Sequence, residues 1–323
     1  MTGMSIRLAV LGAAHAHVRY ALDEVDHRDD VDLVGVSDSG GGYDAGYTDH
    51  RRLLDDQHPD VVMIAGVYAD RAAAVVDALR AGAHVLADKP LCTDLAQLDA
   101  IEEAARAAGR TVSLLLEKRH YPETLAARAL LDAGALGELV QVAGTGPHKL
   151  NRPARPGWFL RRASYGGILG DLAVHDIDLV LLLSGATGGT VTGVADRSAE
   201  FARYGSLLLQ AGPVAATIEV NWLTPQASPH HGDYRMRLTG THGTAELYWA
   251  QGRLIATTTD RAPWEVELPP GRRPAEGALA AFATGREPEV GTAASLTATR
   301  IALLAQESAD DGGTVRDWKG HQA

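Results

Sequence analysis

Cysteine and phenylalanine are scarce in this 323-residue chain. It has one cysteine, Cys92, which excludes an internal disulfide framework and is typical of a reducing compartment, so we expect a cytoplasmic protein. It has three phenylalanines although 46% of its residues are hydrophobic. The core is therefore expected to consist largely of Ala, Val and Leu, as in helices that pack on parallel strands. This composition favours an α/β protein.

Long apolar runs and a basic excess are also absent. No run approaches the roughly 20 apolar residues that a membrane-spanning helix needs, and residues 1 to 11 lack the basic start, apolar stretch and cleavage site of a secretion signal. The formal net charge is −11, whereas nucleic-acid-binding proteins usually present a basic face. We expect a soluble protein with neither a membrane nor a nucleic-acid partner.

Apolar segments alternate with helical patterns over the first third of the chain. The predicted strands are Ile6 to Leu11, Asp32 to Ser37, Val61 to Ala65, His84 to Ala87 and Thr111 to Leu116. Helical spacing occurs over residues 18 to 25, 72 to 81 and 95 to 108, the last capped by Thr93 or Asp94. The alternation predicts a Rossmann domain, a doubly wound parallel sheet, over residues 1 to 120.

The second part of the chain, residues 121 to 323, has a different pattern. A helical stretch over 124 to 133 precedes a Pro- and Arg-rich loop over 151 to 162 and a second helix. The predicted strands that follow are Thr190 to Ala195, Ser206 to Leu209, Val214 to Trp222, Tyr234 to Thr239, Thr244 to Trp249 and Leu254 to Thr258. A helical pattern over 293 to 309 comes last. Successive strands with tight turns predict a C-terminal α+β domain with a mostly antiparallel open sheet.

The turn after the first strand, in VLGAAHAHVRYAL over residues 10 to 22, resembles a dinucleotide-binding turn that has lost two glycines. Gly12 fills the first glycine position, but Ala14 and His17 stand at the other two. The turn still follows a strand and opens a helix, so its free N–H groups are expected to face a pyrophosphate.

His15 and His17 in this turn have three readings. As metal ligands they are poorly placed, because two residues that are two apart do not share a helix face and no third ligand is evident nearby; we expect no metal. Their imidazoles could instead line the helix start and add donors toward the phosphates. In the third reading His17 fills space between helix and sheet.

Asp38, in VGVSDSG, ends the second predicted strand. A carboxylate there accepts the ribose hydroxyls of NAD and repels the 2′-phosphate of NADP, and Ser39, Gly40, Gly41 and Gly42 offer no arginine. NAD is therefore favoured over NADP. The alternative is a turn residue that breaks the strand before the glycines.

Lys89 follows the fourth predicted strand, in AGAHVLADKPLCTDL over residues 81 to 95. Open α/β sheets bind ligands at the carboxyl ends of their strands. An ammonium group there can stabilise negative charge on a substrate oxygen. The other reading is a solvated lysine in a turn that Pro90 fixes.

A second polar group lies in GGILGDLAVHDIDLVLLLSG, residues 166 to 185, where paired glycines precede a helix that is apolar around most of its circumference. Asp171, His175 and Asp178 fall on one stripe of this helix, and Asp176 points elsewhere. Burying such groups is costly without partners. The stripe therefore needs a polar network, such as an Asp171–His175 pair, or a ligand.

These segments together resemble the glucose-fructose oxidoreductase, inositol dehydrogenase and rhizopine catabolism (Gfo/Idh/MocA) family. Members carry Glu-Lys-Pro where this chain has Asp88, Lys89 and Pro90, and many have a histidine where this chain has Arg71. The resemblance covers nearly the whole chain. Besides the segments above, it includes KRHYPETLAARALLDAGALGEL (118 to 139), GTHGTAEL (240 to 247) and AFATGREP (281 to 288).

The resemblance implies an enzyme that transfers a hydride between a nicotinamide cofactor and a secondary alcohol or ketone of a sugar or polyol. His175 would be the general acid/base, Asp171 would orient the substrate or the imidazole, and Lys89 would hold the reacting oxygen. A homodimer or homotetramer formed through the second domain is also implied. Two alternatives stay open: an NAD-retaining enzyme that cleaves glycosides, and a non-catalytic NAD- or sugar-binding sensor.

Cofactor and substrate contacts are expected from two further sets of residues. The cofactor set is Gly12, Ala13, Ala14, His15, Asp38, Asp88, Lys89 and Pro90. The substrate set is Arg119, Tyr121, His148, Trp158 and Arg161.

Overall fold

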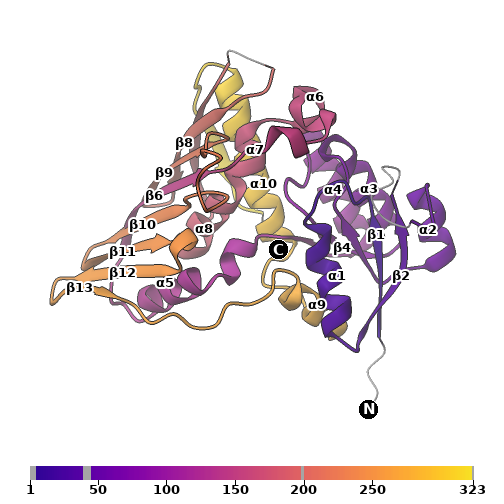
Figure 1. Cartoon of the computed structure of the whole chain (residues 1–323), viewed down its shortest axis with the longest axis horizontal. Coiled ribbons are helices and arrows are strands. Elements are labelled where there is room, and N and C mark those ends of the chain that lie inside the picture. The colour runs from indigo at the N-terminus through magenta and orange to yellow at the C-terminus, as the bar shows by residue number, and fades with distance from the viewer. Residues whose placement is uncertain (1–4, 39–44, 198–199, 322–323) are drawn as a thin grey trace.

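The computed structural model describes residues 5–38, 45–197 and 200–321. Within them the chain forms two sheets with helices between and around them (Figure 1). None of the helices formed by these residues is both long and apolar enough to cross a membrane.

The first sheet is parallel, with the strand order β2-β1-β3-β4-β5. Its strands are β1 (Ile6–Leu11), β2 (Val31–Ser37), β3 (Val61–Ile64), β4 (His84–Ala87) and β5 (Val112–Leu114). Every residue of β3 is buried, which explains why this strand is apolar without alternation. The predicted Rossmann-type sheet is confirmed.

Helices cover both faces of this sheet. They are α1 (Val18–His27), α2 (His50–Gln57), α3 (Tyr68–Arg80), α4 (Leu95–Ala108) and, from far along the chain, α9 (Glu276–Ala283). Helices α3 and α4 contribute to the core on one face, and α1 and α9 to the core on the other. In α9, Leu279 packs with Leu8 and Val10 of β1. The sequence analysis did not predict α2 or α9.

The second sheet is mixed, with the order β13-β12-β11-β10-β6-β9-β8-β7-β14. Its strands are β6 (Leu139–Pro147), β7 (Gly188–Ala195), β8 (Tyr204–Ala211), β9 (Val214–Asn221), β10 (Arg235–Gly240), β11 (Gly243–Tyr248), β12 (Arg253–Thr258), β13 (Arg261–Glu265) and β14 (Arg316–Lys319). Only the β6–β9 pair is parallel among the pairs that the described residues form. The mostly antiparallel sheet is therefore confirmed, with the unpredicted β6 at its centre.

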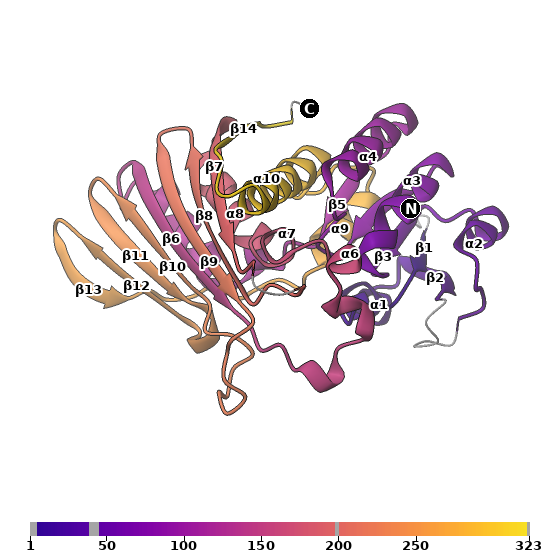
Figure 2. The ribbon, with the colours of Figure 1, turned by 90° about the horizontal axis from the view of Figure 1, so that it is seen from above.

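Helices cover one face of the second sheet and leave the other uncovered (Figure 2). They are α5 (Pro122–Asp132), α7 (Ile168–Leu172), α8 (Val174–Ser184) and α10 (Thr292–Asp310), with the short α6 (Arg162–Tyr165) ahead of α7. The predicted single helix over 166–185 is thus two helices, α7 and α8, which meet at Ala173. On the uncovered face Val194, Tyr204 and Leu208 are 60%, 48% and 55% exposed.

Helix α10 joins the two halves. It packs on β7 and also against α4 and β5. The Thr292 and Ser295 hydroxyls accept hydrogen bonds from the N–H groups of Val112 and Leu114 on the edge strand β5, each at 3.0 Å. These side chains satisfy backbone donors that an edge strand leaves unpaired.

Candidate active site

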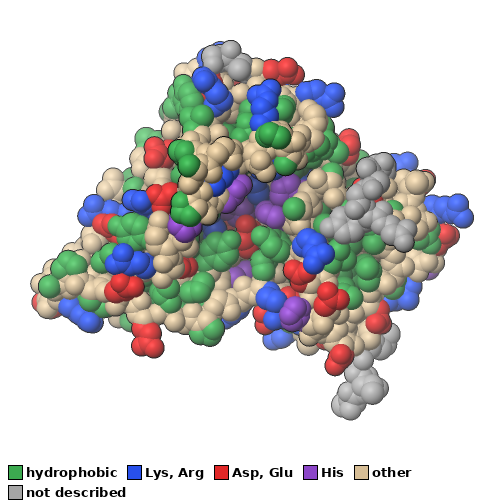
Figure 3. Space-filling model, viewed as in Figure 1, with side chains coloured by type: hydrophobic (Ala, Val, Ile, Leu, Met, Phe, Trp, Pro, Cys, Tyr) green, Lys and Arg blue, Asp and Glu red, His purple; other side chains and the backbone are tan. Residues whose placement is uncertain are grey.

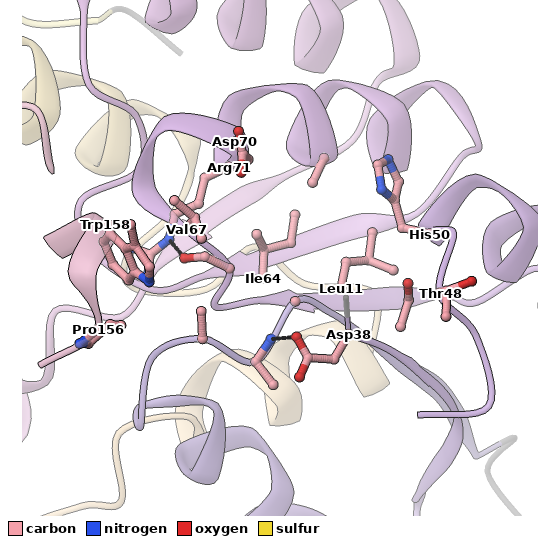
Figure 4. Close-up of a pocket in the computed structure, with 16 residues that line it drawn as sticks. Leu11, Asp38, Thr48, His50, Ile64, Val67, Asp70, Arg71, Pro156 and Trp158 are labelled. Atoms are coloured by element: carbon pink, nitrogen blue, oxygen red, sulfur yellow. Dashed lines mark hydrogen bonds between the residues drawn. The ribbon is translucent and has the colours of Figure 1, made fainter. Parts of the chain in front are cut away.

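Two cavities lie at the carboxyl ends of the first sheet's strands. The first has a volume of about 500 Å³ and is lined by Gly12, Ala13 and Ala14 of the β1–α1 turn, by Asp38 after β2, and by Trp158 from the second half (Figure 4). This is the edge at which doubly wound sheets bind ligands.

Gly12 needs to be glycine in this turn. Its φ is +74°, and a Cβ built on it would lie 2.7 Å from the Cα of Gly66. The N–H of Ala13 donates to Asp38 Oδ1 at 3.4 Å. Gly12, Ala13, Ala14 and Asp38, all predicted cofactor residues, therefore meet at one cavity, while residues 39 to 42 lie outside the described part of the chain.

His15 and His17 face away from the first cavity, toward Asp88 at the end of β4. The Nδ1 of His15 lies 2.9 Å from Asp88 Oδ2, and the Nδ1 of His17 hydrogen-bonds Asp88 Oδ1 at 2.8 Å. Both imidazoles line the second cavity. This orientation does not support the reading in which they add donors toward the phosphates, and that reading stays a prediction.

Asp88 and Arg71 form a fully buried ion pair, and Arg71 also lines the first cavity (Figure 4). Arg71 Nη2 lies 2.7 Å from Asp88 Oδ2, and Arg71 Nη1 donates to the carbonyl oxygens of Asp88 and Pro90, each at 2.9 Å. Burial alone raises the pKa of Asp88, but His15, Arg71 and His17 hold it well below its ordinary value. Asp88 and Pro90 line neither cavity; their role is to shape the turn that presents Lys89, whose bond to Pro90 is cis.

His15, His17 and Asp88 also offer three potential metal-ligand atoms within 4.8 Å of one another. The sequence analysis found no third ligand because Asp88 is distant in the chain. However, the Arg71 guanidinium already neutralises this carboxylate. A cation would therefore compete with a buried arginine for its only anionic ligand.

The second cavity, of about 400 Å³, lies between the two halves of the chain. Its lining is rich in cationic and imidazole groups: Lys89, Lys118, Arg155, His15, His17, His148, His175 and His231, with Glu117 as the carboxylate. Histidine, lysine and arginine side chains gather in the central hollow of the molecular surface (Figure 3). Lys89 and His175, which come from opposite halves, thus face the same space.

Lys89 is held by Asp171 at the end of α7. Its Nζ donates to Asp171 Oδ1 at 2.7 Å and to the Asp171 carbonyl oxygen at 3.3 Å. Asp171 is 1% exposed and Lys89 5%. The Asp171–His175 pair, one of the alternatives that the sequence left open, is absent among the described residues; the Asp171 carboxylate holds the Lys89 ammonium group instead.

His175 lies beside Glu117, which follows β5. The His175 Nε2 is 3.6 Å from Glu117 Oε1. Burial and the nearby charges of Lys89 and Lys118 hold the pKa of His175 well below its ordinary value. Burial has the opposite effect on the carboxyl group of Glu117 and raises its pKa, although the charge of His17 acts against this rise. The pair therefore favours a neutral imidazole beside a carboxyl group that holds its proton more tightly than usual.

The two aspartates of α8, Asp176 and Asp178, form buried ion pairs with residues 118 and 119. Lys118 Nζ donates to Asp176 Oδ1 at 2.6 Å, and Lys118 lines the second cavity. Arg119 makes two hydrogen bonds to Asp178, at 2.6 and 2.5 Å. The three residues of the predicted stripe, Asp171, His175 and Asp178, therefore contact three different partners: Lys89, Glu117 and Arg119, respectively.

The predicted substrate residues separate into three groups. Tyr121 and His148 line the second cavity. Trp158 lines the first cavity, where its ring lies 5.0 Å from that of Tyr68, a lining residue of the second. Arg119 and Arg161 line neither, because Arg119 is committed to Asp178 and Arg161 is exposed. The substrate contacts expected of these two arginines stay predictions that this arrangement does not support.

Glu117, Lys118 and Arg155 are the main residues that the sequence analysis missed. Glu117 and Lys118 follow β5 in LLLEKRH, at the same sheet edge as Lys89. That position was a usable signal, but the 3₁₀ turn Glu117–His120 decides which side chains face the cavity. Arg155 lies in a loop without periodicity, so no local pattern distinguished it from its arginine neighbours.

Two family models match the chain. The model described as an oxidoreductase family with an NAD-binding Rossmann fold matches residues 6–115. The model of the GFO/IDH/MocA C-terminal domain matches residues 124–246. The first match covers the turn, Asp38 and Lys89, and the second covers Asp171 and His175.

Curated proteins and solved structures are similar to the chain as well. D-glucoside 3-dehydrogenase of Escherichia coli (strain K12) is 26% identical over 198 residues, 57% of this chain and 56% of that protein. The NAD(+)-dependent scyllo-inositol 2-dehydrogenase of Bacillus subtilis (strain 168) is 24% identical over 263 residues, 74% and 72% of the two chains. An inositol dehydrogenase homolog from Azotobacter vinelandii, solved with NAD+, has a TM-score of 0.81 at 19% identity over 98% of both chains.

The curated matches are partial. The chain spans 34%, 56% and 38% of the length of three of the curated relatives that it matches. The likeness to the solved structures extends over nearly the whole fold.

Proposed function

Because the chain belongs to the Gfo/Idh/MocA oxidoreductase family, we propose that it is an NAD-dependent dehydrogenase or reductase of a sugar or polyol. The reaction is hydride transfer between the cofactor and a secondary alcohol or ketone. The similarity to a glucoside dehydrogenase and an inositol dehydrogenase supports this substrate class.

The observation that carries the proposal is the joint position of Lys89 and His175. One follows a strand of the cofactor-binding sheet and the other belongs to a helix of the second half, yet both line one cavity of about 400 Å³. The ring of Tyr68, which lines this cavity, lies 5.0 Å from that of Trp158, which lines the one at Gly12 and Asp38, so the two cavities are neighbours. Proton-transfer groups thus lie next to a dinucleotide-binding turn.

The first cavity fits a dinucleotide. Gly12 has a positive φ, and its close approach to the backbone of Gly66 leaves no room for a side chain where the turn lines the cavity. Asp38 lines the same space at the end of β2, where a carboxylate can accept ribose hydroxyls and repel a 2′-phosphate. These features support NAD over NADP.

A bound nicotinamide supplies the hydride acceptor in the oxidation and the hydride donor in the reduction. In the oxidation, the substrate hydroxyl proton passes to the neutral imidazole of His175 as the C–H bond gives up its hydride, which leaves a carbonyl group. Lys89, held by Asp171, donates a hydrogen bond to the same oxygen and stabilises the negative charge that develops on it. The reduction runs through the same groups in reverse.

The proposal is tested by a fluorescence titration with NADH and NADPH, followed by turnover assays on sugars and polyols. We expect NADH binding and NADH formation with a hydroxylated substrate. Replacing the general acid/base in His175→Asn lowers kcat by about 10²–10⁴-fold with NADH affinity retained. The matched control is His27→Asn, an exposed histidine of α1.

Failure to bind either cofactor overturns the proposal. Cleavage of a glycoside without net NADH formation supports the glycosidase alternative. Unchanged turnover in both Lys89→Ala and His175→Asn contradicts the assigned roles.

A further inference from the structure

The second cavity is cationic in a chain whose formal net charge is −11. Lys89, Lys118 and Arg155 line it, and its one lining carboxyl group, Glu117, has a pKa raised by burial. Such a contrast between a site and the rest of the molecule indicates a ligand of opposite charge.

The three cations differ in their partners. Lys89 lies 2.7 Å from Asp171, and Lys118 lies 2.6 Å from Asp176, so a buried carboxylate balances each ammonium group. Arg155 has no carboxylate partner among the described residues. Its side chain makes one hydrogen bond, from Nε to the carbonyl oxygen of Leu150 at 3.0 Å.

Arg155 is nevertheless held in place. Its guanidinium carbon lies 4.4 Å from the ring centroid of Phe159 and 5.0 Å from that of Trp222. Stacking on aromatic rings orients the planar group and leaves the N–H donors of its two Nη atoms for another acceptor. A guanidinium group fixed in this way matches the two oxygens of a carboxylate or a phosphate.

We propose that the substrate is a monosaccharide-sized compound with an anionic group, a carboxylate or a phosphate, which the guanidinium of Arg155 binds. This inference rests on the proposed function and narrows its substrate class. Arg155 thereby becomes the residue that selects acidic over neutral sugars, while Lys89 and His175 act on the reacting carbon. The cavity volume of about 400 Å³ lies in the range of small-molecule sites.

The competing assignment is a contact between Arg155 and a cofactor phosphate. It arises because Pro156 and Trp158, in the same loop, line the first cavity. Arg155 itself lines the second cavity. The two assignments predict different responses of NADH affinity and of substrate affinity.

The test is isothermal titration of the NADH-saturated protein with D-gluconate, D-glucuronate and D-glucose 6-phosphate, and with D-glucose and myo-inositol as neutral counterparts. We expect at least one anionic compound to bind about tenfold or more tightly than its neutral parent. Arg155→Gln removes that preference and Arg155→Lys retains part of it. The matched control, Arg152→Gln in the same loop, changes an exposed arginine and retains the preference. Comparing the binding of the sugar acids with that of the sugar phosphate shows whether Arg155 binds a carboxylate or a phosphate.

Equal or weaker binding of every anionic compound overturns the inference and leaves the proposed function standing if NADH binds and a neutral sugar turns over. If Arg155→Gln raises the Kd for NADH and leaves the preference for anionic compounds unchanged, Arg155 binds the cofactor, and this result also overturns the inference. Loss of the proposed function is recognised separately, by the absence of NADH binding in the unmodified protein.

Discussion

The histidines around the second cavity differ in protonation because their neighbours differ. Burial and the ammonium group of Lys89 lower the pKa of His148 and His175 well below the ordinary value. Burial also acts on His17, but Asp88 and Glu117 outweigh it, so the pKa of His17 is raised. These shifts favour the neutral form of His175, which the proposed base requires, and the protonated form of His17.

The pH profile of alcohol oxidation tests this assignment. Because the lowered pKa keeps His175 neutral, kcat/KM falls only when the pH is well below 6.5. Lys118 is one of the main charges that lower the pKa of His175, and its partner Asp176 is not among the main groups that act on it. The Lys118→Met/Asp176→Asn double variant is therefore expected to raise the pKa of His175 and move the acid limb to higher pH. The double variant Arg119→Met/Asp178→Asn removes a comparable buried pair outside the cavity and serves as the control. An acid limb at or above pH 6.5, or equal shifts in both double variants, contradicts the assignment.

Asp38 gives a second test at the scale of one side chain. Replacing it by serine removes the charge that repels a 2′-phosphate, so we expect the ratio of the Kd values for NADPH and NADH to fall about tenfold, which corresponds to roughly 1.4 kcal/mol. Asp32→Asn, at an exposed position on β2, the strand that Asp38 follows, leaves the ratio unchanged. Fluorescence titration with both cofactors measures this, and an unaltered ratio in Asp38→Ser assigns the carboxylate to the turn alone.

Among the local elements, the β1–α1 turn is the most constrained. In Gly12→Ala, the new Cβ meets Gly66 at 2.7 Å and the backbone keeps a φ of +74°. We expect a loss of about 1–3 kcal/mol in the free energy of unfolding and weaker NADH binding.

Gly277→Ala provides the opposite case for the same substitution. Gly277 is helical in α9, and its Cβ would meet no atom within 4 Å. Alanine there raises the free energy of unfolding by up to about 1 kcal/mol. Denaturant unfolding of both variants measures the two effects, and a Gly12→Ala protein as stable as the parent contradicts the role given to this turn.

Local patterns predicted the elements whose own residues determine them. The apolar runs of β1, β3 and β4 indicated a buried parallel sheet, and Asp94 was named as a cap of α4, where its side chain accepts from the Gln97 N–H. Strand β6 was not predicted, because Gly144 and Gly146 interrupt the alternation of its apolar residues. Helix α9 was not predicted because it is short and apolar except at Glu276 and Gly277, so it shows no amphipathic pattern, and it packs on the distant strand β1.

The site was predictable where one residue follows one strand, and unpredictable where contacts join distant segments. Lys89 could be placed from the end of β4. The partners of Asp88 could not, because Arg71, His15 and His17 reach its carboxylate only after three strands have paired. The ion pair of Arg119 could not be predicted for a related reason, since its partner Asp178 lies on another element.

For the whole molecule, the uncovered face of the second sheet carries a prediction. Val194, Tyr204 and Leu208 lie on neighbouring strands of that face and are about half exposed. Exposed apolar patches of this kind mark association surfaces, so we propose that two copies of the chain pair through this face. Leu208→Asp is expected to halve the mass measured by light scattering while circular dichroism and NADH affinity stay unchanged. A parent protein that is monomeric at micromolar concentration contradicts the proposal.

The return of the chain to its first sheet has a consequence for building chimeras of this protein. An exchange at residue 120 would separate Leu8 and Val10 from Leu279 of α9. It would also separate the N–H groups of Val112 and Leu114 from the hydroxyl groups of Thr292 and Ser295. The transplanted N-terminal segment would then expose an apolar face of the first sheet and the unpaired edge of β5. A productive graft of cofactor specificity between relatives therefore has to move residues 275–295 together with the N-terminal segment.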